Sequence, residues 1–600
     1  MKALKVLSLI LICATTFRIA TAQTMPKENT KAAHQARRDG VITVRVVNDT
    51  GRSIAGAPII VEKVGDKGMG GLQIGITDDE GEFKTCGLDP GSYTISTIVP
   101  GYVVALTDSE RNHHHPGENV TINLVKGGVI TGRVTDAYGE PMVGVGAKAV
   151  KVRDLEGGQK YAGDRVDWNT RLTDDRGVYR LYGLAPGVYV VGASRDQSAL
   201  YGGFYSGREV MTWHPSSPRA TAKEIVVRSG EQVTGADIRH REERGHTISG
   251  IIISEIASGG ADIMLVSVAG RQLIGMTSVY VTKGFEMFGV PDGEYEMIAS
   301  RTIGLESYYA SSTPRRVVVK GADVSGVELK MALPASISGL VKIEASSLGG
   351  VRNSPCEDGA QTKDRSSIEE VLLSAAPDNE LVSSRQSIES IAFQSRYFFD
   401  PLHHFFDAMN AAPDEKGNFT LRELAAGRFR IKADLPDDGW YIRAITQPAS
   451  GAAEKPGDAS RNGIAIKAGE ELSGVEVVIA EGAASLNGRV VPAKGESKLP
   501  SRLRVHLIPA EVSAADDVLR YAETMVSAGG GFEFRHVAPG KYLLHTRLAA
   551  ETEVNNDQAR PLAWDAVERA KLRREAAAAK NEIELKVCER VKDHLLRWQP

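Results

Sequence analysis

Short stretches of alternating apolar and polar residues run along most of the chain, separated by turns rich in Gly, Pro and Asp. The segment 129–194 shows this most clearly. It contains Ile130-Thr-Gly-Arg-Val-Thr-Asp136, Thr173-Asp-Asp-Arg-Gly177, Val178-Tyr-Arg-Leu181, Gly183-Leu-Ala-Pro-Gly187 and Val188-Tyr-Val-Val-Gly192. A period of two predicts strands with one face on a core and one in water. Gly, Pro and Asp suit the tight turns between them, so the segment is predicted to be all-β.

The same strand–turn–strand pattern recurs four more times, as hairpins around residues 77–95, 284–298, 414–431 and 531–544. Every hairpin carries one aromatic residue at the same place in its second strand: Tyr93, Tyr189, Tyr295, Phe429 and Tyr542. These anchors lie roughly 95 to 135 residues apart, which is the length of one β-sandwich per copy. We therefore predict that the five anchors occupy equivalent strand positions in five consecutive sandwiches.

Further strands flank the hairpins. Four copies open with a strand that ends in Gly: Ile130–Gly132, Thr247–Gly250, Ser336–Gly339 and Ser485–Gly488. Closing strands are predicted at Val120–Leu124, Gln232–Ile238, Ser325–Leu329, Ser473–Val477 and Asn581–Leu585. The predicted sandwiches are therefore residues 39–126, 127–243, 244–333, 334–481 and 482–600.

Two copies depart from the pattern. The fourth carries a long polar insertion at about 345–413, irregular apart from the apolar run Val371-Leu-Leu373. The fifth contains a passage at about 559–580 that is rich in Ala and Arg, which predicts a short helix with Leu562, Val567 and Leu572 on one side.

The repeated string resembles the carboxypeptidase regulatory-like domain, a seven-stranded prealbumin-like sandwich also grouped with carbohydrate-binding-like folds. The second copy matches nearly throughout, the first closely, and the last three keep the hairpin. As a whole the chain resembles multi-copy exported proteins of soil bacteria. The resemblance implies a tandem array of Ig-like or prealbumin-like β-sandwiches. It brings no catalytic residue, because a neighbouring peptidase domain would be a separate unit.

The N-terminus predicts export. Lys2 and Lys5 precede the apolar stretch Val6–Phe17, and Ala20-Thr-Ala22 suits a signal peptidase, so residues 1–22 are predicted to be a signal peptide and 23–38 a linker. Lipidation at Cys13 is disfavoured, because Ile12 stands where a small residue is required. No later segment has 18 apolar residues in a row. We expect a protein of the periplasm, the outer surface or the medium.

Charge and cysteine content narrow the partners. The net charge is −4 with acids and bases interspersed, which argues against nucleic acid as a partner. After signal removal Cys86, Cys356 and Cys588 remain, so one disulfide at most can form. Ordinary core positions are favoured for all three, and a Cys356–Cys588 bridge stays open.

No motif for catalysis is present: the chain has no His-Glu-x-x-His, no Gly-x-Ser-x-Gly and no phosphate-binding Gly-x-x-x-x-Gly-Lys. We expect no catalytic residue, no cofactor and no metal site. His113-His-His115 and His403-His404 are interpreted as polar loops rather than metal ligands. Thr77-Asp-Asp79 and Thr173-Asp-Asp175 are interpreted as Asx turns rather than calcium sites.

Aromatic residues in long loops are the remaining candidates for binding. Tyr201, Phe204, Tyr205, Trp213 and His214 fall in one loop of the second sandwich, and Tyr397-Phe-Phe399 with Phe405-Phe406 in the fourth-copy insertion. Packing of these rings onto the sandwich is favoured. The alternative is a sugar-binding surface, which requires Trp213 and Tyr205 to be partly exposed.

The sequence thus predicts a non-enzymatic envelope or extracellular scaffold, or adhesion-type module, with envelope or surface proteins as partners. A polysaccharide-binding protein is the alternative, and an enzyme with an unrecognised site is the remote one.

Overall fold

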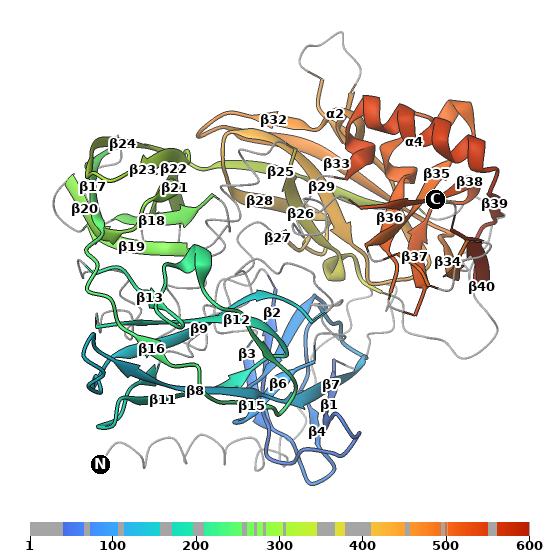
Figure 1. The fold of residues 1–600 in the computed structure, drawn as a ribbon. Helices are drawn as coiled ribbons and strands as arrows, with labels where there is room; N and C mark the ends of the chain where they lie inside the picture. The colour runs from blue at the N-terminus through green and yellow to red at the C-terminus, as the bar shows by residue number, and fades with distance from the viewer. Residues whose placement is uncertain are drawn as a thin grey trace, which may run out of the picture. The chain divides into compact units, whose positions relative to one another are not determined.

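The computed structural model describes residues 40–598 except 65–71, 106–112, 156–170, 196–208, 255–260, 269–272, 280–283, 304–307, 345–365, 379–409, 450–455, 494–497, 501, 528 and 550–560. The predicted signal peptide and linker fall outside these residues. Strands dominate throughout, from the first sandwich, blue in Figure 1, to the last, red.

The described residues of the first sandwich form seven strands in two sheets. One sheet has the order β4 (Glu82–Lys84), β1 (Thr43–Asn48), β7 (Asn119–Lys126), β6 (Tyr102–Val104), and the other β3 (Leu72–Ile76), β2 (Pro58–Lys63), β5 (Tyr93–Thr97). The opening strand β1 pairs antiparallel with the first hairpin strand β4 and parallel with the closing strand β7.

The second unit repeats this two-sheet arrangement, and the third keeps the pairing of opening, hairpin and closing strands within a single sheet. In the second, one sheet has β11 (Val178–Leu184), β8 (Gly128–Thr135), β15 (Gln232–Val233) and β16 (Ile238–Arg239), and the other β10 (Arg171–Leu172), β9 (Gly146–Arg153), β12 (Gly187–Ser194), β13 (Thr212–Trp213) and β14 (Ile225–Val227). The third has β20 (Gly284–Val290), β17 (His246–Ile253), β24 (Val324–Ala332), β22 (Tyr308–Ser312), β21 (Gly293–Ile303), β18 (Ala261–Ser267), β19 (Leu273–Val279) and β23 (Arg315–Val319). Here β22 pairs with both β21 and β24, so the strands form one continuous sheet.

The fourth and fifth units carry additional elements. The fourth has β28 (Asn418–Leu424), β25 (Ala335–Glu344), β33 (Glu471–Glu481), β30 (Trp440–Gln447) and β31 (Gly457–Asp458), over β27 (Asn410–Ala411), β26 (Leu372–Pro377), β29 (Gly427–Asp434) and β32 (Ile464–Ile466). The fifth has β37 (Gly531–Val537), β34 (Ala484–Val491) and β40 (Arg590–Arg597), over β36 (Ala522–Met525), β35 (Leu503–Pro509), β38 (Gly540–Leu548) and β39 (Glu582–Leu585). Their helices are α2 (Ala459–Asn462) and α4 (Ala566–Ala579), with short 3-10 turns η5 (Ile368–Glu370), η7 (Val512–Ala514), η8 (Val518–Arg520) and η9 (Leu562–Trp564).

Each unit encloses its own apolar core between its sheets. No sheet of the described residues crosses a predicted domain boundary. The predicted fold class, an all-β tandem array of about five sandwiches with a short helical passage in the last, is confirmed.

The anchor prediction is also confirmed. Each anchor lies at or near the start of the second hairpin strand and is at most 4% exposed. Four of the five rings carry a hydroxyl that donates to the carbonyl four residues earlier. The bonds are Tyr93–Asp89 at 2.8 Å, Tyr189–Ala185 at 2.6 Å, Tyr295–Pro291 at 2.8 Å and Tyr542–Ala538 at 2.5 Å. The anchor therefore fixes the turn of the hairpin to its strand, and Phe429 does so by packing alone.

The glycine of the opening strand has a steric cause. A Cβ on Gly339 would overlap the carbonyl oxygen of Val475 in the parallel closing strand, and Gly250 and Gly488 meet Val327 and His594 in the same way. The register between the two strands shifts at each of these three glycines. In the first sandwich, whose opening strand lacks the glycine, β1 and β7 pair without a shift.

Three details of the prediction are wrong. The fifth closing strand is β40, while Asn581–Leu585 contains β39, which pairs with the second hairpin strand β38. The fourth-copy insertion contains β26, a core strand whose Leu373 and Ala375 are buried. In α4, Val567 is 74% exposed and only Leu572 of the predicted stripe is buried. Alternation alone does not distinguish one edge strand from another.

The helix α4 is built as its local sequence directs. The Asp565 carboxylate accepts hydrogen bonds from the N–H groups of Val567 and Glu568, at 2.8 and 3.1 Å, and caps the first turn. Lys580 adopts the left-handed conformation that ends the helix. Leu572 and Ala576 pack on Ile508 of β35, so α4 covers the outer face of this sheet (Figure 1).

The cysteines differ from the expectation of three core residues. Cys86 is a free thiol on the surface, in the turn between the hairpin strands of the first sandwich. Cys588 is disulfide-bonded, and Cys356 lies outside the described residues.

Candidate functional site

The predicted aromatic site of the second sandwich is closed at Trp213. Its side chain is 5% exposed and packs with Val190 and Met211. The ring lies against Gly192, where a Cβ would meet it, and the Arg219 guanidinium lies 4.8 Å from its centre. The favoured interpretation of Trp213, packing onto the sandwich, is therefore what the structure shows, and the partial exposure that the sugar-binding alternative requires is not found.

His214 is also buried, at 7% exposed, and its Nδ1 lies 2.6 Å from the carbonyl oxygen of Asp237. Tyr201, Phe204 and Tyr205 lie outside the described residues, as do His403-His404 and the aromatics at 397–399 and 405–406. A sugar contact at Tyr201, Phe204 and Tyr205 stays a prediction.

The three consecutive histidines are not an exposed loop, since His115 is only 6% exposed, and two of them share one carboxylate. His113 Nδ1 lies 3.5 Å from an Asp434 oxygen, while the Nδ1 atoms of His114 and His115 lie 3.3 and 3.1 Å from the two oxygens of Glu118. Burial would raise the pKa of Glu118, but the hydrogen bonds and positive charge of the two histidines outweigh it and lower the pKa to about 2. In the described part of the chain no group of His, Cys, Asp or Glu is placed to hold a metal ion.

The Thr-Asp motifs form turns, as predicted. Asp78 Oδ1 accepts from the N–H groups of Glu80 and Glu82, and Asp174 Oδ1 does the same at the equivalent turn. The preceding Thr77 hydroxyl donates to the Ile54 carbonyl oxygen at 2.7 Å, which ties the turn to the body of the sandwich. The residues of the motif are thereby occupied in holding the backbone.

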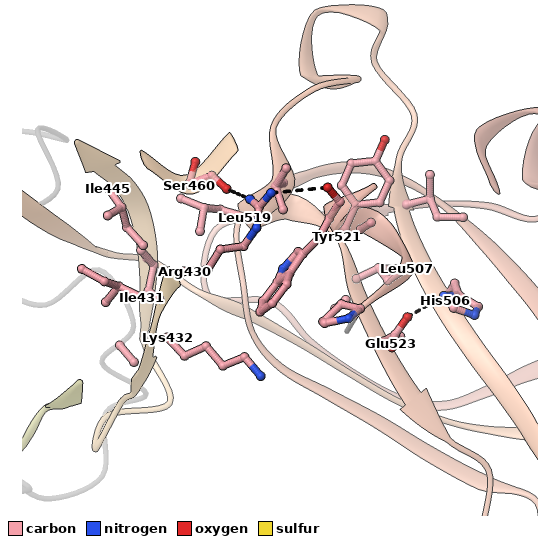
Figure 2. Close-up of a pocket in the computed structure, with 18 of the residues that line it drawn as sticks. Arg430, Ile431, Lys432, Ile445, Ser460, His506, Leu507, Leu519, Tyr521 and Glu523 are labelled. Carbon is pink, nitrogen blue, oxygen red and sulfur yellow. Dashed lines mark hydrogen bonds and ion pairs between the residues drawn. The ribbon is translucent and has the colours of Figure 1, made fainter. Parts of the chain in front are cut away.

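A cavity of about 560 Å³ lies between the fourth and fifth sandwiches (Figure 2). One wall is β29 with the ends of β30 and α2, and the other is β35, β36 and η8. The crossover from β38 to β39 contributes Pro561, Ala563 and Trp564, and α4 contributes Leu572. This volume falls in the range of small-molecule sites in proteins, about 300–1,000 Å³.

Arg430 dominates the wall from the fourth sandwich. Its alternate neighbours Phe429 and Ile431 face the core, so the guanidinium lies on the outer face of the sheet. It is 5% exposed, and its Nε donates to Asp378 Oδ2 at 3.2 Å. The other guanidinium nitrogens donate to the carbonyl oxygens of Ser460 and Trp564. The ion pair with Asp378 lies within the fourth sandwich and fixes the guanidinium, and the hydrogen bond to the Trp564 carbonyl oxygen is its contact with the fifth sandwich.

Glu523 and His506 form the polar part of the opposite wall. Leu503, Val505 and Leu507 of β35 face the core, so His506 lies on the outer face beside Glu523 of β36. His506 Nδ1 lies 3.3 Å from one Glu523 oxygen, and Arg504 donates to the other at 2.6 Å. The His506 Nε2 atom has no hydrogen-bond partner among the described residues. Burial would raise the pKa of Glu523, but His506, Arg504 and Arg547 outweigh it and lower the pKa, so the carboxylate stays ionised.

Lys432 faces this pair from β29, as Figure 2 shows. Its ammonium lies 5.3 Å from the centre of the Trp564 ring, and the Arg430 guanidinium lies 5.1 Å from the same ring. No carboxylate of the described residues forms an ion pair with Lys432 within 4 Å. The Lys432 side chain is exposed, but the surrounding protein atoms reduce the hydration of its ammonium and so lower its pKa. The negative charge of Glu523 raises the pKa and offsets this only in part.

Further contacts hold the two walls together. The Asp516 carboxylate lies 2.8 Å from Arg461 of the fourth sandwich and 3.1 Å from Arg569 of α4. His536 Nδ1 lies 3.0 Å from the Trp440 carbonyl oxygen, also across the joint. The cavity is therefore bounded by directed contacts as well as by apolar packing.

No motif in the sequence pointed to this site. Trp564 lies in a stretch that predicts a helix, and its partner Arg430 is 134 residues away in another sandwich. A period-two strand marks Arg430 and Lys432 only as outward-facing positions. The one usable signal was a Trp beside the start of a polar, Ala-rich helix, with no partner apparent in its own segment.

Comparison with known proteins finds no family model that matches, and no curated protein matches either. Among solved structures, the Bacillus anthracis TIE protein has a TM-score of 0.13 and 14% identity. The match covers 49% of this chain and 51% of the TIE protein. The minor pilin GBS52 of Streptococcus agalactiae has a TM-score of 0.19 and 15% identity, covering 33% of this chain and 94% of its own. The major pilin SpaD of Corynebacterium diphtheriae has a TM-score of 0.13 and 9% identity, and the match covers 50% of this chain and 100% of the pilin. Likenesses this weak support no conclusion about what the chain does.

Proposed function

We propose that this chain is an exported, non-catalytic scaffold or adhesion-type module of a bacterial envelope, whose partners are envelope or surface proteins. The anchored hairpin, built the same way five times with a buried aromatic, carries the proposal. It makes each sandwich a frame whose fold depends on its own core. The segments that connect the strands are then free to differ, and binding residues concentrate on such segments.

The joint between the fourth and fifth sandwiches supports the same role. A scaffold needs joints that resist separation, and this one has the hydrogen bond from Arg430 to the Trp564 carbonyl oxygen, the Arg461–Asp516 ion pair and the His536 contact. The buried ion pair with Asp378, inside the fourth sandwich, holds the Arg430 guanidinium in place for the first of these contacts. The predicted signal peptide at residues 1–22 supports export. Among the described residues, no helix combines the length and the hydropathy needed to cross a bilayer.

The proposal is tested by retention on envelope fragments. Mature chain beginning at Gln23 is incubated with fragments of the producing cell's envelope in three forms: untreated, protease-treated and periodate-treated. The scaffold role predicts saturable retention that protease abolishes and periodate leaves intact. Retention lost with periodate, and reduced by alanine at Tyr201, Phe204 and Tyr205, would favour the polysaccharide-binding alternative. Absence of retention on all three preparations would overturn both.

A further inference from the structure

The cavity between the fourth and fifth sandwiches has features that a scaffold role does not require. Two sandwiches that only need to adhere would fill their joint, since protein interiors pack as densely as organic crystals. Here about 560 Å³ is left open between otherwise directed contacts. The lining is mainly apolar with a few charged groups, which is the usual composition of a small-molecule site.

The charges around the cavity do not balance. Arg430 is matched by Asp378, and Glu523 by Arg504, each through a hydrogen-bonded ion pair. Lys432 has no such partner in the described part of the chain, and Glu523 attracts its charge only at longer range, without an ion pair. One positive charge is therefore left on the cavity wall. Its position over Trp564 stabilises the ammonium weakly, because a cation–π contact at an exposed site contributes only about 0.5–1 kcal/mol.

The rest of the lining determines the other half of the ligand. Its partly exposed apolar residues are Ala433, Ile442, Leu519, Ala522 and Pro561, together with the ring of Trp564. The aliphatic side chains among them offer no hydrogen bond, so they favour an apolar body. A ligand that satisfies both parts of the wall is an anion at one end and a hydrocarbon over the rest.

We propose that this cavity binds a small carboxylic acid with an apolar body, whose carboxylate pairs with Lys432. The acid's chain lies along Ile442 and Leu519, beside Trp564. Glu523 stays paired with Arg504 and His506 and so does not repel the ligand's carboxylate with an unmatched charge. The site does not depend on the scaffold role, since it concerns one joint and not the partners of the whole chain.

The test is isothermal titration of the mature chain with three probes: octanoate, octylamine and acetate. Octanoate is expected to bind saturably at one site and at least tenfold more tightly than octylamine, which has the same chain and the opposite charge. Acetate, which has the charge without the chain, is expected to show no saturable binding. Lys432→Met is expected to weaken octanoate at least tenfold, and a tenfold change corresponds to about 1.4 kcal/mol.

Two further variants keep the result interpretable. Lys432→Arg retains the charge and is expected to retain octanoate binding within about threefold, since either cation can pair with a carboxylate. Lys416→Met removes an exposed lysine from a turn of the same sandwich and is expected to change nothing. The proposal is overturned if octanoate does not saturate, if octylamine binds as well, or if folded Lys432→Met binds octanoate unchanged. Should Lys432→Met not fold, the probes on the natural chain and on Lys432→Arg decide.

Discussion

Two tryptophans lie beside outer faces of corresponding sheets, Trp213 in the second sandwich and Trp564 in the fifth, and each has an arginine near its ring. Trp213 is 5% exposed and packs on the sheet of its own sandwich, with Val190 and Met211 around it. Trp564 is half-buried, takes its arginine from the neighbouring sandwich, and lines a cavity.

The difference lies in what covers the sheet. The second sandwich covers the outer face of β12 with its own following segment, so the ring is completely enclosed. The fifth uses α4 for part of the face and leaves the rest, with His506 and Glu523, toward the fourth sandwich. In the second sandwich the covering segment belongs to the same unit and encloses the Trp213 ring, whereas the contact between the fourth and fifth sandwiches leaves a cavity beside Trp564. Packing was the favoured interpretation of the aromatic loop at Trp213, and the structure agrees, whereas the candidate site lies where two sandwiches meet.

The largest effect is expected from Arg430→Met. It leaves the Asp378 carboxylate buried without its guanidinium, so the fourth sandwich should lose about 3–5 kcal/mol, and it also removes the hydrogen bond to the Trp564 carbonyl oxygen of the fifth. The free energy of opening of β29, measured by native-state amide exchange, reports this. Arg428→Met, exposed on the same strand, should cost less than about 1 kcal/mol. An equal loss in the two variants would show that the buried pair does not stabilise the fourth sandwich.

A second effect separates the two tryptophans. Trp213→Ala should destabilise the second sandwich by about 3–5 kcal/mol, as expected for an enclosed large side chain. Trp564→Ala should cost the fifth about 1–2 kcal/mol, because the ring already faces open space and less packing is lost. Amide exchange of β12 and β38 in the two variants gives both values. Similar losses of stability for Trp213→Ala and Trp564→Ala would show that the two rings are equally enclosed, against the distinction drawn between them.

A third effect depends on pH. The folded pKa of Glu523 is lowered below its ordinary value of 4.5, so its stabilisation is complete above pH 4.5 and is lost as the pH falls below that value. Glu523→Gln should destabilise the fifth sandwich by about 1–2 kcal/mol at pH 7 and flatten the fall between pH 4.5 and 3. Thermal unfolding between pH 3 and 7 measures this. Glu533→Gln, an exposed carboxylate of the same sandwich, should leave the acid limb unchanged; a matching change there would refute the assignment.

The smallest effect concerns the anchors. Tyr189→Phe should cost about 0.5–1.5 kcal/mol for one lost hydrogen bond, and Tyr542→Phe somewhat more, because Arg520 Nε also lies 3.2 Å from that hydroxyl. Phe429→Tyr should cost nothing, since the carbonyl of Ala425 stands at the position that accepts in the other four copies. Amide exchange of β12, β38 and β29 compares the three. A clear loss for Phe429→Tyr would show that the fourth hairpin is not equivalent to the others.

Local pattern was sufficient to predict most of the fold. The period-two strands, the Thr-Asp turns and the anchors Tyr93 to Tyr542 depend on neighbours within about 20 residues, so each copy carries its own instructions. The glycines of the opening strands were visible as a pattern, but their cause was not. The closing-strand carbonyl that excludes a Cβ at Gly339 belongs to Val475, far along the chain.

The candidate site could not be predicted from the sequence, because it too depends on residues that are distant along the chain. Trp564, Arg430 and Glu523 come from a crossover and two different sandwiches, and no spacing rule connects them. β40 was missed because it is mostly exposed, with Leu595 at 69%, while the preceding β39 alternates more clearly. Where a residue's role depends on contacts with another sandwich, the composition of its own segment does not predict that role.

The cover of the second sandwich is closed, whereas the joint between the fourth and fifth is open and, we propose, binds a ligand. The most direct test is fluorine NMR of mature chain labelled with 5-fluorotryptophan, titrated with octanoate, with Trp213→Phe and Trp564→Phe used to assign the two signals. We expect the Trp564 signal to shift saturably and the Trp213 signal to stay fixed, and Lys432→Met to abolish the shift at the same octanoate concentration. A Trp213 signal that moves with octanoate, or a Trp564 signal that does not, would contradict the account.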